Sequence, residues 1–129
     1  MKRIEVVAAV ITKDDKILAT ERGYGDLKGF WEFPGGKIEA GESNEAALKR
    51  ELSEEMHAEI EVGDFITTVE YDYPNFHLTM HCYFCTLKNS TIDLLEHLDA
   101  KWLQVSELDG MKWCPADIAV VEAIKQLSA

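Results

Sequence analysis

The chain lacks the features that mark secreted or membrane-anchored proteins. It has three cysteines among 129 residues, and an odd, small cysteine set favours free thiols in a reducing compartment. No run of about 18 apolar residues occurs, so we expect no membrane-spanning helix and no membrane partner. The apolar start of the chain is interrupted by Glu5 and lacks a signal-peptide cleavage site, which favours a first strand. These absences together predict a cytoplasmic protein.

Positive charge is also scarce. The sequence has 13 Lys and Arg against 24 Asp and Glu, a net charge of −11. Nucleic-acid polymers are bound by basic surfaces that release counterions, so we expect no such partner. A small polyanionic substrate would be repelled as well, unless bound metal ions invert the local electrostatics. The length and the 47% hydrophobic content fit one globular domain over residues 1–129.

The only cysteine motif is the C-x-x-C of Cys82 and Cys85. It lies in a strand-like run, where an offset of three places the two side chains on opposite faces. No second pair completes a zinc site. We therefore interpret these residues as structural thiols.

Apolar spacing and turn residues predict strands and helices in alternation. Asp14-Asp15 and Pro74-Asn75 indicate two tight turns, and Ser43 is a candidate helix N-cap. We expect strands over 4–11, 16–22, 59–71, 78–87 and 101–105, loops over 37–42 and 88–98, and helices over 43–56 and from Pro115 onward. This order predicts an α/β sandwich with a mixed β-sheet between two main helices.

The most informative stretch is GKIEAGESNEAALKRELSEEMHA, residues 36–58. Residues three and four apart share a helix face, so Glu51, Glu54 and Glu55 are expected to project together and to repel. A divalent cation would neutralise that repulsion. Mg²⁺ takes one or two carboxylates together with substrate phosphate oxygens, so the stretch indicates a helix that presents Mg²⁺ to a polyphosphate.

The same stretch resembles the signature of the Nudix hydrolase family. The positions that match are Gly36, Glu42, Arg50, Glu51, Leu52, Glu54 and Glu55. Two positions depart, because His57 replaces the family's glycine and Ala58 its larger aliphatic residue. The glycine ends the helix in the left-handed conformation, and we expect His57 to adopt the same conformation. The resemblance also implies the Nudix α/β/α fold.

This resemblance implies hydrolysis of a nucleoside diphosphate derivative with Mg²⁺ or, as a second possibility, Mn²⁺. It assigns the metal to Glu51, Glu54 and Glu55 with the Gly36 carbonyl, and it gives Arg50 the role of orienting a carboxylate. The alternative without a metal site is a solvent-exposed helix face stabilised by salt bridges of Arg50 and Lys49.

Two further residues, Arg22 and Glu96, are implied by the resemblance to the MutT-like branch, and Lys37 is a candidate because phosphate oxygens need cationic donors and it follows the double glycine. Arg22 matches an arginine that contacts phosphate, with pairing to Glu21 or Asp26 as the alternative. Lys37 is a weaker phosphate-binding candidate. Glu96 stands six residues before Trp102 and is implied as an additional metal ligand or general base, although it is also explicable as one more acid in a solvated loop.

The base-binding candidates lie outside the signature. Asp117 occupies the place of an asparagine in the 8-oxo-dGTP enzymes, and an ionised carboxylate only accepts hydrogen bonds. It would suit the cytosine amino group or the N1–H and amino group of guanine, and we expect Asp117→Asn to affect cytosine nucleotides most. The alternative is an acid favoured by the helix dipole. The remaining candidates are Phe33, Asn75 and Phe76, with Tyr73 and Trp113 as weaker ones.

The sequence therefore predicts a Mg²⁺-dependent nucleoside triphosphate pyrophosphohydrolase acting on CTP- or dCTP-type substrates or on oxidised nucleotides such as 8-oxo-dGTP. One alternative is a Nudix hydrolase for nucleotide sugars, ADP-ribose or dinucleotides. The other is a non-catalytic nucleotide-binding module. The oligomeric state is left open.

Overall fold

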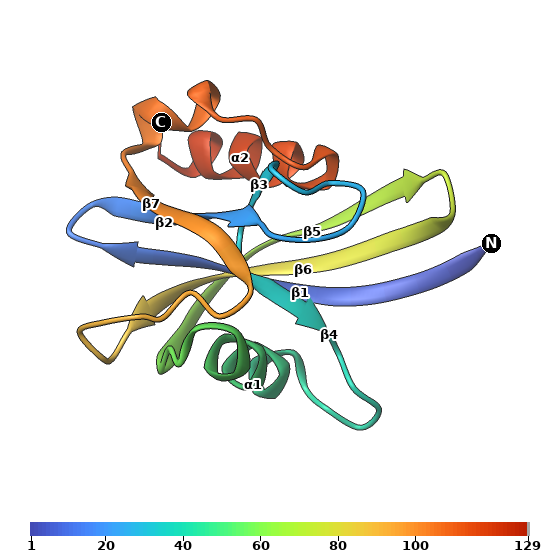
Figure 1. Cartoon of the computed structure of the whole chain (residues 1–129), viewed down its shortest axis with the longest axis horizontal. Helices are drawn as coiled ribbons and strands as arrows, with labels where there is room; N and C mark the ends of the chain where they lie inside the picture. The colour runs from blue at the N-terminus through green and yellow to red at the C-terminus, as the bar shows by residue number, and fades with distance from the viewer. Residues whose placement is uncertain (129) are drawn as a thin grey trace.

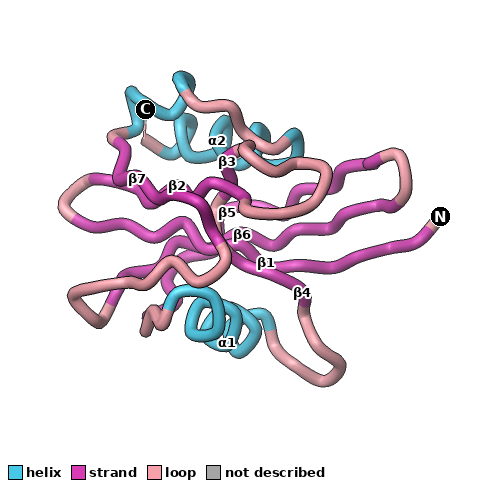
Figure 2. The backbone as a smooth tube through the Cα atoms, viewed as in Figure 1, coloured by secondary structure: helices cyan, strands magenta, loops and turns pink. Residues whose placement is uncertain are grey.

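The computed structural model describes residues 1–128 and shows a mixed sheet between two helices (Figure 1). This is the α/β sandwich that the sequence predicts. The strands are β1 (Lys2–Lys13), β2 (Lys16–Arg22), β3 (Trp31–Glu32), β4 (Gly35–Lys37), β5 (Ile60–Tyr73), β6 (Phe76–Leu87) and β7 (His97–Leu103). The helices are α1 (Asn44–Met56), the short 3-10 helix η1 (Val105–Gly110) and α2 (Pro115–Leu127). Figure 2 shows the loops that join them.

The sheet is mixed because β1 runs parallel to β6, whereas the other strand pairs are antiparallel. Its order is β3-β2-β1-β6-β5, with β4 added to β1 and β7 added to β2. The β1–β2 register joins Thr12 to Ile17 and Lys13 to Lys16, next to the turn. Beyond these pairs β1 is hydrogen-bonded to β4, and β2 to β3 and β7. The two strands therefore separate.

Each face of the sheet carries its own apolar core. The core beneath α1 includes Leu48, Leu52 and Met56 of the helix, all fully buried. The core beneath α2 includes Val120, Val121 and Ile124. In Figure 1 the two helices lie on opposite sides of the strands. Burial of apolar surface on both faces is the main stabilising term of such a sandwich.

Cap residues set both ends of α1. The Ser43 side chain accepts a hydrogen bond from the Ala46 N–H at 3.1 Å, so the predicted N-cap is confirmed. His57 follows the helix at φ 51° and ψ 31°, in the left-handed conformation predicted for it. The N–H of Ala58 then donates to the Leu52 carbonyl at 3.2 Å, which closes the end of the helix.

The predicted turns are confirmed as well. Asp14 and Asp15 both have positive φ, as a two-residue hairpin turn with matching strand twist requires. Pro74-Asn75 joins β5 to β6, whose register begins at Tyr73 and Phe76. Cys82 belongs to the core beneath α2 and Cys85 to the core beneath α1, so these free cysteines do lie on opposite faces.

Several boundaries differ from the sequence-based expectation. Lys37 was expected in a loop but ends β4, a strand of three residues that is too short to show a periodic pattern. The expected strand 101–105 instead runs from His97 to Leu103, because pairing with β2 extends it toward the acidic loop. The helix η1 was not expected. Within residues 1–128, no helix is both long enough and apolar enough to cross a membrane.

Candidate functional site

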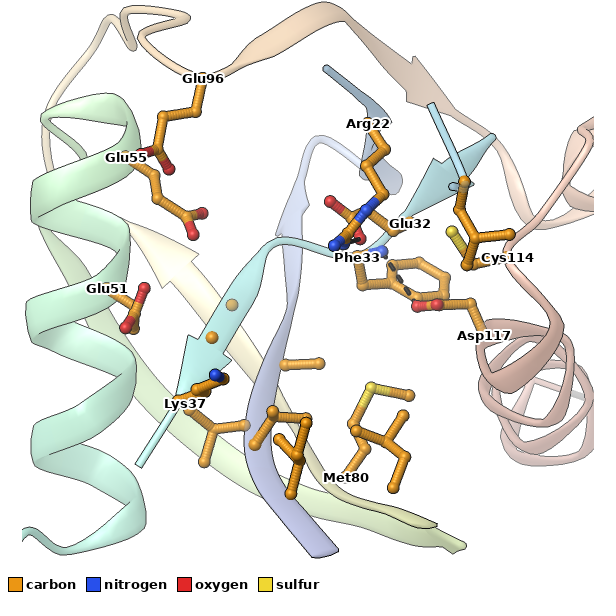
Figure 3. Close-up of a pocket in the computed structure, with 18 of the residues that line it drawn as sticks. Arg22, Glu32, Phe33, Lys37, Glu51, Glu55, Met80, Glu96, Cys114 and Asp117 are labelled. Carbon is orange, nitrogen blue, oxygen red and sulfur yellow. Dashed lines mark hydrogen bonds and ion pairs between the residues drawn. The ribbon is translucent and has the colours of Figure 1, made fainter. Parts of the chain in front are cut away.

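A cavity of about 420 Å³ opens where β1 and β2 part. Its walls come from β1, β2 and the loop after it, the segment from β3 to β4, α1, the end of β5, β6, the start of β7 and the first turn of α2. Figure 3 shows the carboxylates of Glu51, Glu55 and Glu96 on one side, and Phe33 and Asp117 with the Arg22–Glu32 pair on the other. The cavity therefore has an acidic end beside α1 and an apolar end beside α2.

The acidic end is formed by Glu51, Glu55 and Glu96, whose carboxylates point into the cavity (Figure 3). Glu55 is buried, and its Oε2 has no hydrogen-bond partner. Burial, followed by the negative charges of Glu51, Glu96 and Glu32, raises the pKa of Glu55 to about 9. Several carboxylates lie close together here, and the nearby cations do not balance their combined negative charge. A bound metal ion would reduce this repulsion.

Glu51 reaches the cavity because residue 36 has no side chain. A Cβ on Gly36 would collide with the Glu51 carboxylate. Gly35 is equally constrained, since a Cβ there would strike the Val7 carbonyl of β1. The double glycine thus lets β4 pass between β1 and the acidic face of α1.

Arg50 holds the outer side of this end. Its Nε and Nη2 donate to the two carboxylate oxygens of Glu42 at 2.7 and 2.9 Å, and its Nη1 donates to Glu51 Oε1 at 2.9 Å. Nη2 also donates to the Lys37 carbonyl at 2.9 Å. Hydrogen bonding to Arg50, helped by the Glu39 N–H, lowers the pKa of Glu42 to about 2. Arg50 therefore fixes Glu51 relative to β4 through contacts on both.

Glu54 lies elsewhere. Its side chain is 60% exposed, pairs with Arg50 at 3.3 Å and does not line the cavity. On a helix, residue i+4 lies closer to the face of residue i than residue i+3 does, so Glu51 and Glu55 share the cavity face while Glu54 turns outward. The expectation that all three project together is met by two of them. Among residues 1–128, no three His, Cys, Asp or Glu side chains are gathered closely enough to enclose an ion.

The cationic candidates Arg22 and Lys37 both line the cavity. Arg22 Nη1 donates to Glu32 Oε1 at 3.0 Å, and its guanidinium lies 4.6 Å from the ring centroid of Tyr24. Its partner is thus Glu32 rather than Glu21 or Asp26, the two residues considered from sequence. Lys37 is exposed at the rim of the cavity.

At the apolar end, Asp117 is only 5% exposed, and its Oδ1 accepts the Phe33 N–H at 3.2 Å. Burial, reinforced by the charge of Glu32, raises the pKa of Asp117 to about 8. This carboxyl therefore favours its neutral form far more than a free aspartate does, which differs from the ionised form assumed from sequence. Phe33 is also buried and stacks on Trp113 with ring centroids 4.7 Å apart.

The other base-binding candidates divide into two groups. Tyr73 and Phe76 line the cavity and stack on each other at 5.0 Å. Asn75 is exposed in the β5–β6 turn and Trp113 lies behind Phe33, so neither lines the cavity. A turn residue points away from the sheet that carries its neighbours, which explains the position of Asn75.

Sequence reasoning did not select two polar residues of the cavity, Glu32 and His97. Glu32 stands next to Phe33 in WEFPGGK, and His97 directly follows Glu96. Their position next to a site candidate was the only sequence signal for these two residues. It is weak because side chains alternate between faces along a strand.

Comparison with known proteins agrees with this architecture. A model of the NUDIX domain matches residues 1–124. The CTP pyrophosphohydrolase of Escherichia coli K12 is 38% identical over 130 residues, covering 100% of this chain and 96% of that protein. The 8-oxo-dGTP diphosphatase of Proteus vulgaris is 37% identical over 87 residues, covering 66% and 78%.

A solved structure gives the same result. The solution structure of the E. coli ORF135 protein superposes with a TM-score of 0.86 at 37% identity, covering 100% of this chain and 93% of that one. The fold, the double glycine and the acidic face of α1 thus coincide with a family match over nearly the whole length. The chain belongs to the Nudix family.

Proposed function

We propose that this protein hydrolyses nucleoside triphosphates to the monophosphate and pyrophosphate. The observation that carries the proposal is that one cavity combines an acidic end, two cationic side chains and an apolar end closed by a buried acid. A nucleoside triphosphate needs metal-binding carboxylates and cations for its phosphates and an apolar surface for its base. The cavity brings these environments together. The related proteins named as CTP pyrophosphohydrolase and 8-oxo-dGTP diphosphatase support the same substrate class.

Nudix hydrolases generally use divalent metals such as Mg²⁺. The residues at the acidic end fit such an ion, because Glu55 has a buried oxygen without a partner and Mg²⁺ needs only one or two carboxylates besides phosphate oxygens. In the proposed site Glu51, Glu55 and Glu96 hold the metal with the Gly36 carbonyl, whereas Glu54, outside the cavity, acts through its ion pair with Arg50 at 3.3 Å. The metal supplies charge stabilisation on phosphate and an activated water.

The chain's own cations take the rest of the polyphosphate. Arg22 projects from the end of β2 and Lys37 from the end of β4, on either side of the opening. A guanidinium offers paired donors to phosphate oxygens, whereas an ammonium acts as a point charge. Glu32 occupies one of the Arg22 donors, so a phosphate has to share or replace this contact.

Asp117 and the aromatic residues are proposed to bind the base. The neutral acid presents an O–H donor and a C=O acceptor, which complement N3 and the N4 amino group of cytosine. The ionised form presents two acceptors, which complement N1–H and the amino group of guanine. Because the pKa is about 8, both forms are accessible near neutral pH. Phe33 and Phe76 supply apolar surface against the base.

The test is a panel of nucleotides incubated with Mg²⁺ or Mn²⁺, with pyrophosphate and phosphate quantified separately. CTP, dCTP, 8-oxo-dGTP, the unmodified triphosphates, ADP-ribose and a nucleotide sugar form the panel. We expect pyrophosphate and monophosphate from triphosphates. Release of phosphate alone, or activity confined to ADP-ribose or sugar nucleotides, would contradict the proposal. Binding without turnover would favour the non-catalytic reading.

A further inference from the structure

His97 lies at the junction between the two ends of the cavity. It is the first residue of β7 and pairs in register with Arg22 of β2. A Cβ on Gly23 would collide with the carbonyl of Glu96, so the chain before β7 packs directly on the turn after β2. This close packing places the imidazole inside the cavity, where its side chain is only 5% exposed.

One edge of the imidazole faces two carboxylates. His97 Nε2 lies 3.6 Å from Glu32 Oε2 and 4.0 Å from Glu55 Oε2. The opposite nitrogen, Nδ1, is buried and has no hydrogen-bond partner within residues 1–128. The two distances from Nε2 exceed hydrogen-bond length, so the carboxylates face this nitrogen without a formed hydrogen bond. A neutral imidazole carries its proton on one nitrogen only. Because the nearest acceptors face Nε2, the proton is favoured there.

The two carboxylates belong to different parts of the site. Glu32 binds Arg22 through its other oxygen, at 3.0 Å. Glu55 belongs to the acidic end, and its Oε2 has no hydrogen-bond partner. A row of charged and polar groups thus runs from the guanidinium of Arg22 through Glu32 and His97 to the metal-binding carboxylate proposed above.

We infer that His97 is a positioning residue, whose Nε2–H orients the Glu55 carboxylate for the metal and links it to the Glu32–Arg22 pair. This inference rests on the proposed function, because it assigns the metal to the acidic end. Partners that orient a metal ligand in this way contribute about 10–100-fold in metal affinity or activity.

Two amide substitutions separate the nitrogens. In His97→Gln the side-chain NH₂ is as many bonds from the backbone as Nε2, whereas in His97→Asn it stands at the level of Nδ1. Both variants keep a polar, uncharged group in the same space. We expect His97→Gln to keep most of the Mn²⁺ affinity and kcat, and His97→Asn to lose about 10-fold or more in each with a smaller change in KM.

Mn²⁺ binding is measured without nucleotide, by the loss of the free-ion electron paramagnetic resonance signal, and unfolding is followed by circular dichroism. Wild-type behaviour of His97→Asn, or equal losses in both variants, would overturn the inference. If the wild type releases no pyrophosphate, the proposed function fails, yet the Mn²⁺ comparison still decides the role of His97.

A measurement on the unchanged protein covers the case in which a variant does not fold. Long-range ¹H–¹⁵N spectra of the metal-free wild type report which imidazole nitrogen carries the proton. We expect a protonated Nε2 on His97. A proton on Nδ1 alone would leave Nε2 unable to donate to either carboxylate and would refute the inference.

Discussion

The two ends of the cavity are built in opposite ways. At the acidic end, Glu51 and Glu55 come from one face of α1, and their like charges are crowded beside Glu96. At the apolar end a single acid, Asp117, is enclosed by aromatic residues and held by one backbone hydrogen bond to Phe33. The first end is arranged to attract a cation, and the second to distinguish neutral hydrogen-bonding patterns. In the proposed function, the clustered carboxylates of the acidic end serve the phosphates, and the buried Asp117 of the apolar end selects the base.

The largest expected effect tests which acids of α1 serve the acidic end. Glu51→Gln keeps the shape but removes a charge that faces the cavity, so we expect kcat to fall by at least about 100-fold. The matched variant Glu54→Gln changes an exposed side chain outside the cavity and should cost much less. Pyrophosphate release under saturating Mg²⁺ measures both. Equal losses would show that Glu54 turns inward in the working enzyme.

Glu96 tests whether the acidic end extends beyond α1. It lines the cavity but lies in the exposed segment before β7. We expect Glu96→Gln to lower kcat by about 10–100-fold and to raise the Mg²⁺ concentration needed for half-maximal rate. The Mg²⁺ dependence of the rate is the measurement. Unchanged kcat would remove Glu96 from the mechanism and confine the acidic end to the helix.

Asp117 tests the apolar end through pH. As pH rises past the pKa of about 8, the neutral acid ionises, so we expect KM to rise for CTP and to fall for a guanine triphosphate. The divergence should approach about 10-fold, the scale of one bidentate base contact. Asp117→Asn presents a donor and an acceptor at every pH. It should therefore keep activity on CTP and lose the pH dependence of KM, whereas the ionised carboxylate assumed from sequence would make CTP the more affected substrate.

The same titration has a consequence for stability. A carboxyl whose pKa is raised from 3.8 to about 8 binds its proton in the folded state at pH values where the unfolded chain has lost it. Its contribution to the free energy of unfolding therefore falls between about pH 4 and about pH 8, by at most about 1.4 kcal/mol per pH unit. Urea unfolding of the wild type and of Asp117→Asn should diverge as pH rises. Parallel curves would contradict the raised pKa.

The smallest effect lies outside the cavity and serves as a reference for both ends. His57→Gly relieves a left-handed residue, which favours the variant by about 1 kcal/mol. It also removes the exposed contact between His57 Nδ1 and Asp93 at 2.9 Å, worth about 0–1 kcal/mol. We expect a small net gain in thermal stability and unchanged kcat. Loss of stability would show that the contact with Asp93 outweighs the backbone conformation.

The same contrast explains what sequence alone could predict. The residues of α1 lie at fixed helical spacing, so the shared face of Glu51 and Glu55 could be predicted from local geometry, whereas the role of Arg50 came from the family resemblance. Asp117 meets Phe33 across 84 positions of the chain, and the raised pKa depends on burial that no local pattern expresses. Glu32 and His97 became neighbours only through the pairing of β3 and β7 with β2. The three-residue β4 was too short to be predicted.

β1 and β2 diverge from the turn that joins them, so a change of angle at this turn would move their far ends most. The two strands are joined by the two-residue turn at Asp14-Asp15, and the cavity lies toward their far ends, near Val6 and Arg22. A seven-residue strand spans about 23 Å, so a rotation of a few degrees at the turn displaces the far end by about 1 Å. The end of the strand pair that borders the cavity is therefore the end on which the geometry of the turn has its largest effect.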